Sequence, residues 1–76
     1  MTAANTKLVT DLVALVLNLP KDAIGTEASM ENMSQWDSLA HLNICLAFQE
    51  RFGVELDMET VARSTSVASL TKLLRE

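Results

Sequence analysis

Apolar residues recur at helical spacing along most of this chain, and no segment shows the apolar–polar alternation that predicts a half-buried strand. A first helix is predicted from about Asn5 to Leu19, where Pro20 stops it. Its expected core face comprises Leu8, Leu12, Leu15, Val16 and Leu19, widened by Val9 and Val13. Its expected exposed arc comprises Lys7, Thr10, Asp11, Ala14 and Asn18. This spacing constrains the chain to an all-α fold.

A long loop separates this helix from the next. Residues 20–36 are expected to have no regular structure, and a loop of this length in a compact domain is often functional. Four apolar side chains are expected to pin it to the core: Ile24, Met30, Met33 and Trp36. The second helix then begins at Asp37 or Ser38 and ends at Phe52, with Gly53 in the left-handed conformation common after helices.

A short third helix and a fourth helix that runs to the C-terminus complete the prediction. Asp57 is expected to cap a third helix that runs to about Ala62, and Ser66 to cap a fourth. The inward-facing residues expected on the third are Met58, Val61 and Ala62, and those on the fourth are Val67, Leu70, Leu73 and Leu74. Residues 1–76 are therefore predicted to form a single domain, a small four-helix bundle of three main helices and a short third one.

The second helix carries two neighbouring apolar stripes. One comprises His41, Ile44, Cys45, Phe48 and Phe52, and the other comprises Leu39, Leu42 and Leu46. So small a bundle cannot easily bury both stripes, so we expect the first to face the core. Leu39 and Leu46 are then candidate docking contacts, with Leu42 between the two roles. The alternative, that all three leucines are core residues, stays open.

The start of the second helix offers an accessible hydroxyl. Asp37 is a good N-cap, and Ser38 then falls at the first helical position, at the mouth of the long loop. A phosphodiester on the Ser38 oxygen would lie beside the positive end of the helix. An Asp-Ser pair at a helix start is nevertheless very common, and as a pair it indicates only a cap.

The surrounding sequence resembles the acyl carrier proteins. The resemblance rests on Asp37-Ser38-Leu39, the hydrophobic helix that follows, and Phe52-Gly53-Val54-Glu55-Leu56, matched without gaps from residue 37 to residue 56. It implies that a phosphopantetheinyl transferase moves a 4′-phosphopantetheine arm from coenzyme A onto Ser38. The arm would carry an acyl group as a thioester for partner enzymes, and the protein itself would not be an enzyme.

The resemblance also assigns roles residue by residue. Asp37 matches the acidic residue before the modified serine. The positions that match partner-facing residues are Leu39, Ala40, Asn43, Leu46 and Glu50, with Leu42 added from the stripe analysis. The positions that match interior residues, where a carried chain is sheltered, are His41, Ile44, Cys45 and Phe48. For His41 the residues themselves favour a partly buried side chain hydrogen-bonded to Asp37, four residues earlier, with contact to the cargo as the alternative.

Two departures from the family pattern stand out. Carriers of fatty-acid synthesis often have carboxylates at the positions of Ala40 and Asn43, and here both are uncharged. Ser34-Gln35-Trp36 replaces the usual Leu-Gly before the motif. These differences favour a specialised pathway, such as polyketide, modified amino-acid or glycan-acylation chemistry, over housekeeping fatty acid biosynthesis. Partner docking is expected to depend less on basic patches and more on apolar contact.

The composition of the chain limits its possible binding partners, its location and its metal chemistry. The formal charge of −4 disfavours nucleic acids and anionic membranes. The first residues lack a basic segment followed by an apolar stretch, so we expect no signal peptide and a cytoplasmic monomer. Cys45 is the only cysteine, so no internal disulfide can form, and we expect a buried, inert thiol. One histidine and one cysteine offer no metal-ligand spacing. The expected partners are the transferase, a loading ligase for acyl or aminoacyl groups, and downstream acyl-transferring enzymes.

Three other functions would fit parts of this sequence. Asp37, Ser38 and His41 are the residue types of a catalytic triad, but they lie within one helical turn and no Gly-x-Ser-x-Gly elbow is present, which argues against a hydrolase. An aminoacyl or peptidyl carrier shares the arm and the bundle, although the Gly-Gly-x-Ser of peptidyl carriers is absent. An unmodified helical protein-interaction module is the third alternative.

Overall fold

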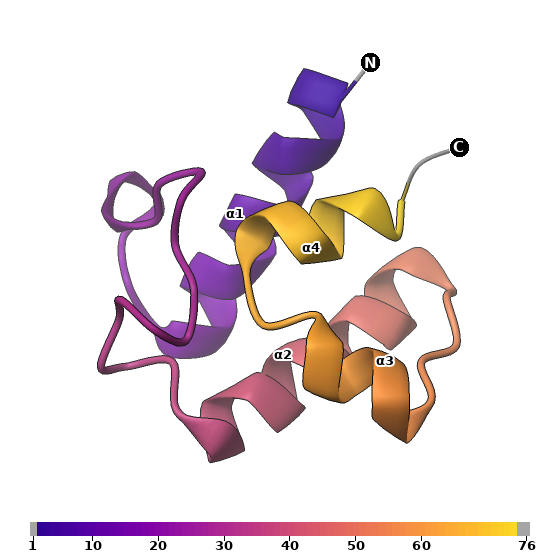
Figure 1. Cartoon of the computed structure of the whole chain (residues 1–76). Coiled ribbons are helices and arrows are strands. Elements are labelled where there is room, and N and C mark those ends of the chain that lie inside the picture. Colours follow the sequence, from indigo (N-terminus) through magenta and orange to yellow (C-terminus); the bar gives the residue numbers. More distant parts are fainter. Residues whose placement is uncertain (1, 75–76) are drawn as a thin grey trace.

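Helices make up most of the part of the chain that the structure describes, residues 2–74 of a computed structural model (Figure 1). The elements in order are α1 (Thr2–Leu17), the 3-10 turn η1 (Lys21–Ala23), α2 (Ser38–Phe52), α3 (Met58–Arg63) and α4 (Val67–Lys72). Within these residues the only β-type pairing is an isolated bridge between Ser29 and Ser66. The predicted all-α four-helix bundle is confirmed, but the prediction of one short helix was wrong, because α4 is as short as α3, with six residues each.

The core lies where α1 packs against both α2 and α4. Figure 1 shows α4 crossing α1, with α3 next to α2. The largest fully buried side chains are Trp36, Phe48, Ile44, Leu70, Val9, Val13 and Val67. Since Trp36 and Ile24 belong to the loop and are buried with them, the predicted pinning of the loop to the core is confirmed; Met30 and Met33 pack against the same cluster.

The core face of α1 differs from the prediction. Leu8 and Leu15 are exposed, whereas Ala14, placed on the exposed arc, is buried. The buried face is centred on Val9, Leu12 and Val13. The difference arises from tertiary packing, because α1 packs against α2, α4 and η1. These three elements cover a wider arc of α1, centred on a different side of the helix from the predicted leucine stripe.

The end of α1 also differs from the prediction. The helix ends at Leu17, two residues before the predicted Leu19, and it begins earlier, at Thr2. Asn18 adopts a left-handed conformation with φ of 61°, and the Leu19 backbone N–H then donates to the Ala14 carbonyl at 2.9 Å. The chain therefore leaves the helix at Asn18 rather than at Pro20, because asparagine tolerates this conformation better than most residues.

The loop between α1 and α2, residues 18–37, has more structure than was predicted for residues 20–36. It contains η1, and its middle is hydrogen-bonded to the connection between α3 and α4. The Met30 N–H donates to the Thr65 carbonyl at 3.0 Å, and the Val67 N–H donates to the Ala28 carbonyl at 3.0 Å. The prediction of a loop without structure of its own was wrong, because these bonds join partners far apart in the sequence.

Both short helices have their predicted caps. The Asp57 side chain accepts from the Thr60 N–H at 2.8 Å, and Ser66 forms a capping box with Ser69. The inward face predicted for α3 is largely wrong, because Met58 is 83% exposed and Ala62 is also exposed. No residue of α3 is fully buried, so this helix rests on the surface of the bundle and does not complete the core.

Candidate functional site

The start of α2 has the predicted capped geometry. Asp37 lies just before the helix with extended backbone, and its Oδ1 accepts a hydrogen bond from the Ala40 N–H at 2.9 Å. Ser38 is the first helical residue and its side chain is exposed. At the other end, Gly53 has φ of 67° and donates to the Gln49 carbonyl, so both predicted ends of α2 are confirmed. The cap engages the carboxylate of Asp37 and leaves the Ser38 hydroxyl at the surface.

His41 has different partners from the one predicted. Asp37 does not hold its ring; the only bond between the two is the ordinary helical one from the His41 N–H to the Asp37 carbonyl. The Trp36 Nε1–H donates to His41 Nδ1 at 3.0 Å, and His41 Nε2 lies 2.7 Å from the Val61 carbonyl oxygen. Sequence reasoning placed Trp36 in the core but missed this bond, although a buried indole N–H usually finds an acceptor.

Ser38 differs from most serines of the chain. The hydroxyl groups of Ser66 and Ser69 bond to each other in the capping box, and the Ser29 hydroxyl accepts from the Glu31 N–H. Ser64 is buried. Ser34 shares the exposure of Ser38, but it lies within the loop rather than at a helix start. Ser38 is thus the exposed serine at the positive end of a long helix.

The outer face of α2 is apolar and largely uncharged. Leu39, Leu42 and Leu46 are 68%, 51% and 60% exposed, so the alternative that all three are core residues is wrong. Asn43 and Glu50 are also exposed, and Ala40 is half-buried. An open hollow of about 550 Å³ along this face is lined by Leu46, Ala47, Gln49 and Glu50. The predicted partner-facing positions therefore share one accessible surface.

The inner face of α2 is packed. His41, Ile44, Cys45 and Phe48 are all buried, as predicted, and Phe48 contacts Phe52 edge to face with ring centroids 4.9 Å apart. Burial raises the pKa of the Cys45 thiol, and its Sγ lies 3.6 Å from His41 Nε2. A thiol with a raised pKa is less often the reactive thiolate, in agreement with the predicted inert cysteine.

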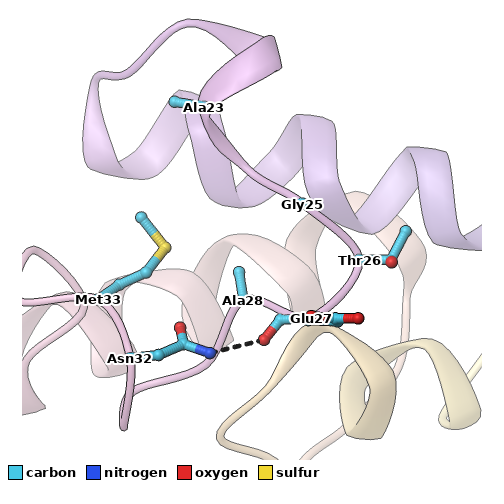
Figure 2. Close-up of a pocket in the computed structure, with 7 residues that line it drawn as sticks. All are labelled: Ala23, Gly25, Thr26, Glu27, Ala28, Asn32 and Met33. Carbon is cyan, nitrogen blue, oxygen red and sulfur yellow. Dashed lines mark hydrogen bonds between the residues drawn. The ribbon is translucent and has the colours of Figure 1, made fainter.

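A separate pocket of about 400 Å³ lies within the loop (Figure 2). Its lining residues are Ala23, Gly25, Thr26, Glu27, Ala28, Asn32 and Met33. The Asn32 side chain donates to the Glu27 carbonyl at 2.8 Å and so closes part of its wall. None of the residues singled out in the sequence as site residues lines this pocket.

The described part of the chain contains neither a metal-binding cluster nor a membrane-spanning helix. Among residues 2–74, no three side chains of His, Cys, Asp or Glu are grouped closely enough to hold a metal ion. Over the same part of the chain, no helix has both the length and the apolar character needed to cross a membrane.

A comparison with known protein families identifies the family of this chain. A family model described as "phosphopantetheine attachment site" matches residues 7–74. The chain belongs to this family. The phosphopantetheine attachment family carries a covalently attached 4′-phosphopantetheine group, and its carrier domains are generally non-catalytic. They work with phosphopantetheinyl transferases and acyl-handling enzymes. A search of curated proteins finds no match to this carrier.

Proposed function

We propose that Ser38 carries the 4′-phosphopantetheine arm and that the protein transports acyl or aminoacyl groups between enzymes. The single observation that supports this assignment is the exposed Ser38 hydroxyl at the first position of α2, directly after the Asp37 cap. The site fits the group, because a phosphodiester there would lie at the positive end of a 15-residue helix and face solvent. When bound, the arm supplies a terminal thiol that holds the cargo as a thioester.

Loading of the arm requires one bond exchange. The Ser38 Oγ bonds to the phosphorus of coenzyme A that bears the pantetheine, and the bond from that phosphorus to the adenosine bisphosphate leaving group breaks. The proton of the hydroxyl passes to a base on the transferase. Asp37 Oδ1 accepts the Ala40 N–H, and the role proposed for Asp37 is to hold the start of the helix that presents Ser38.

Partner enzymes are proposed to dock on the outer face of α2. Leu39, Leu42 and Leu46 supply the apolar contacts, bordered by Ala40, Asn43 and Glu50. The partners are the phosphopantetheinyl transferase, a ligase that loads an acyl or aminoacyl group, and downstream acyl-transferring enzymes. A partner with an apolar docking surface fits this face better than one that relies on a basic patch. This preference supports a specialised biosynthetic pathway, with the carrier acting as a cytoplasmic monomer.

The inner face of α2 is proposed to shelter part of the cargo. Ile44, Cys45 and Phe48 are apolar and lie on the buried inner face of the arm-bearing helix. Neither the loop pocket nor the hollow beside Leu46 reaches them, so entry of a cargo requires these side chains to move apart. Long or branched acyl chains would then be sheltered less well than short ones, because the packed core leaves little room.

The test is enzymatic loading followed by intact-mass measurement. The wild type, Ser38→Ala and Ser34→Ala are each incubated with coenzyme A, magnesium and a broad-specificity phosphopantetheinyl transferase. We expect the wild type and Ser34→Ala to gain the mass of one phosphopantetheine group, and Ser38→Ala to gain none. Ser34 is the matched control, because it is also an exposed serine near the start of α2. An adduct on Ser38→Ala would refute the assignment, and no adduct on the wild type would favour an unmodified interaction module.

A further inference from the structure

The His41 side chain in α2 is hydrogen-bonded to two other segments of the bundle. His41 lies in α2, Trp36 lies at the end of the loop, and Val61 lies in α3. Trp36 and His41 are 1% and 5% exposed, and their rings are 6.0 Å apart. The 3.0 Å bond from Trp36 to the His41 ring is therefore buried, where hydrogen bonds are strong, and the 2.7 Å bond from the ring to Val61 is partly buried.

The partners of the ring determine where its proton lies. An indole N–H can only donate, so His41 Nδ1 accepts from Trp36 and carries no proton. A carbonyl oxygen can only accept, so His41 Nε2 carries the proton and donates to Val61. One neutral tautomer satisfies both bonds at once, and no buried side-chain nitrogen or oxygen of the described residues lacks a partner. A ring that bonds to a cargo would have to release one of them.

The first of these bonds fixes the approach to Ser38. Trp36 is followed by Asp37, which caps α2, and then by Ser38. The Trp36 backbone N–H also donates to the Met33 carbonyl at 3.0 Å. The indole is thus anchored to the side of the same helix that Ser38 begins, and this sets the direction from which the loop enters the helix.

The second bond anchors α3. This helix has no fully buried residue, so apolar packing holds it only weakly. Two side chains of α2 reach toward it: Gln49 accepts from the Leu56 N–H at 2.7 Å in the preceding connection, and His41 donates to Val61 within the helix. His41 therefore ties the placement of α3 to the placement of Trp36 through a single ring.

We propose that His41 is a positioning residue for the loading of Ser38, acting through Trp36, and that it makes α3 and the entry to α2 one rigid unit. The proposal rests on the assignment of the arm to Ser38. It also gives His41 a role different from contact with the cargo. A misplacement of a reacting group by about 1 Å can lower a rate by up to 10²-fold, so loss of the Trp36 anchor should lower the rate of loading by roughly tenfold.

The experiment compares two variants of similar size. In His41→Asn, the amide oxygen can take the place of Nδ1 and accept from Trp36, but the side chain is too short to reach Val61. In His41→Gln, the amide nitrogen can donate to Val61, but no acceptor remains beside the indole. Trp36 is the only tryptophan, so its indole N–H gives a single signal in a proton–nitrogen NMR spectrum and reports the bond directly.

We expect His41→Asn to keep a protected, slowly exchanging indole N–H and to be loaded at close to the wild-type rate. We expect His41→Gln to lose that protection and to show a roughly tenfold lower kcat for the transferase with little change in KM, because positioning acts on the reacting geometry. Equal loading of the two variants would overturn the proposal.

A double-mutant cycle separates positioning from general destabilisation. Trp36→Phe removes the indole N–H and keeps an aromatic ring. If loss of the Trp36–His41 bond causes the lower rate of loading, the double variant Trp36→Phe with His41→Gln should load no more slowly than either single variant. Losses that multiply would contradict the proposal. Failure of the proposed function would be distinguishable, because the wild type would then gain no adduct. The indole N–H signals of the variants would still test the Trp36–His41 hydrogen bond in that case.

Discussion

Asp57 shows how a single side chain adds a pH-dependent contribution to the bundle. Hydrogen bonds from the side chain and the backbone N–H of Thr60 hold the pKa of Asp57 below its ordinary value of 3.8. A pKa that is lower in the folded state than in the unfolded state means that folding favours the ionised form. The resulting stability is fully present above the ordinary carboxyl pKa and is lost as the pH falls through the folded one.

We therefore predict that the stability of Asp57→Asn falls less than that of the wild type as the pH is lowered. Asparagine is also a good N-cap but does not ionise, so the difference in Tm between the two proteins should shrink as the pH falls from about 6 to about 3. Thermal unfolding followed by circular dichroism measures it. Glu59→Gln is the control, because Glu59 forms an exposed pair with Arg63 at 3.3 Å and such pairs contribute little. A difference that stays constant over this pH range would contradict the prediction.

At the scale of the element, the end of α2 depends on a backbone conformation. Gly53 has φ of 67°, and a Cβ added there would meet nothing within 4 Å. Any cost of Gly53→Ala is therefore conformational, about 1 to 2 kcal/mol. Gly25→Ala is the matched control, because a Cβ there also meets nothing and Gly25 is not in the left-handed region.

We predict that urea unfolding will show Gly53→Ala destabilised by about 1 kcal/mol or more and Gly25→Ala unchanged or slightly stabilised. Similar losses for both variants would mean that the end of α2 does not depend on the left-handed residue. The comparison separates conformation from packing, because space is open at both positions.

An element could be predicted from the sequence where local residues determine it, and could not where tertiary contacts determine it. Both ends of α2 could be predicted because Asp37 and Gly53 are local markers. The end of α1 could not, because Asn18 is a weaker marker than the nearby Pro20. The core face of α1 depends on what α4 and η1 cover, which is a tertiary property. For the candidate site, the motif predicted the exposed Ser38, whereas the Trp36–His41 bond required knowledge of how the loop folds back.

At the scale of the whole molecule, the net charge of −4 is unevenly distributed. Helix α2 contains one acid, Glu50, and one base, Arg51. The loop before it, residues 18–37, contains Asp22, Glu27, Glu31 and Asp37 against Lys21 alone. The surface proposed for docking is therefore neutral, although the protein is acidic.

We predict that binding to a partner enzyme depends weakly on ionic strength. Raising NaCl from about 50 mM to about 500 mM should change Kd by less than about threefold, because screening acts on charge contacts and not on apolar ones. Surface plasmon resonance with the loading enzyme measures this. Leu46→Ala should weaken the same complex at both salt concentrations, and Glu27→Gln is the control for a charge outside α2. A loss of affinity of tenfold or more with salt would show that the acidic loop dominates docking.

The hydrogen bonds that join the loop to the α3–α4 connection affect the thermodynamics of binding. Met30 and Val67 each donate across this junction, so the backbone on the approach to Ser38 is already ordered before any enzyme arrives. Ordering a flexible segment during association lowers affinity. In this protein that entropy is lost during folding, so successive enzymes can bind the same preorganised surface without each having to order the loop.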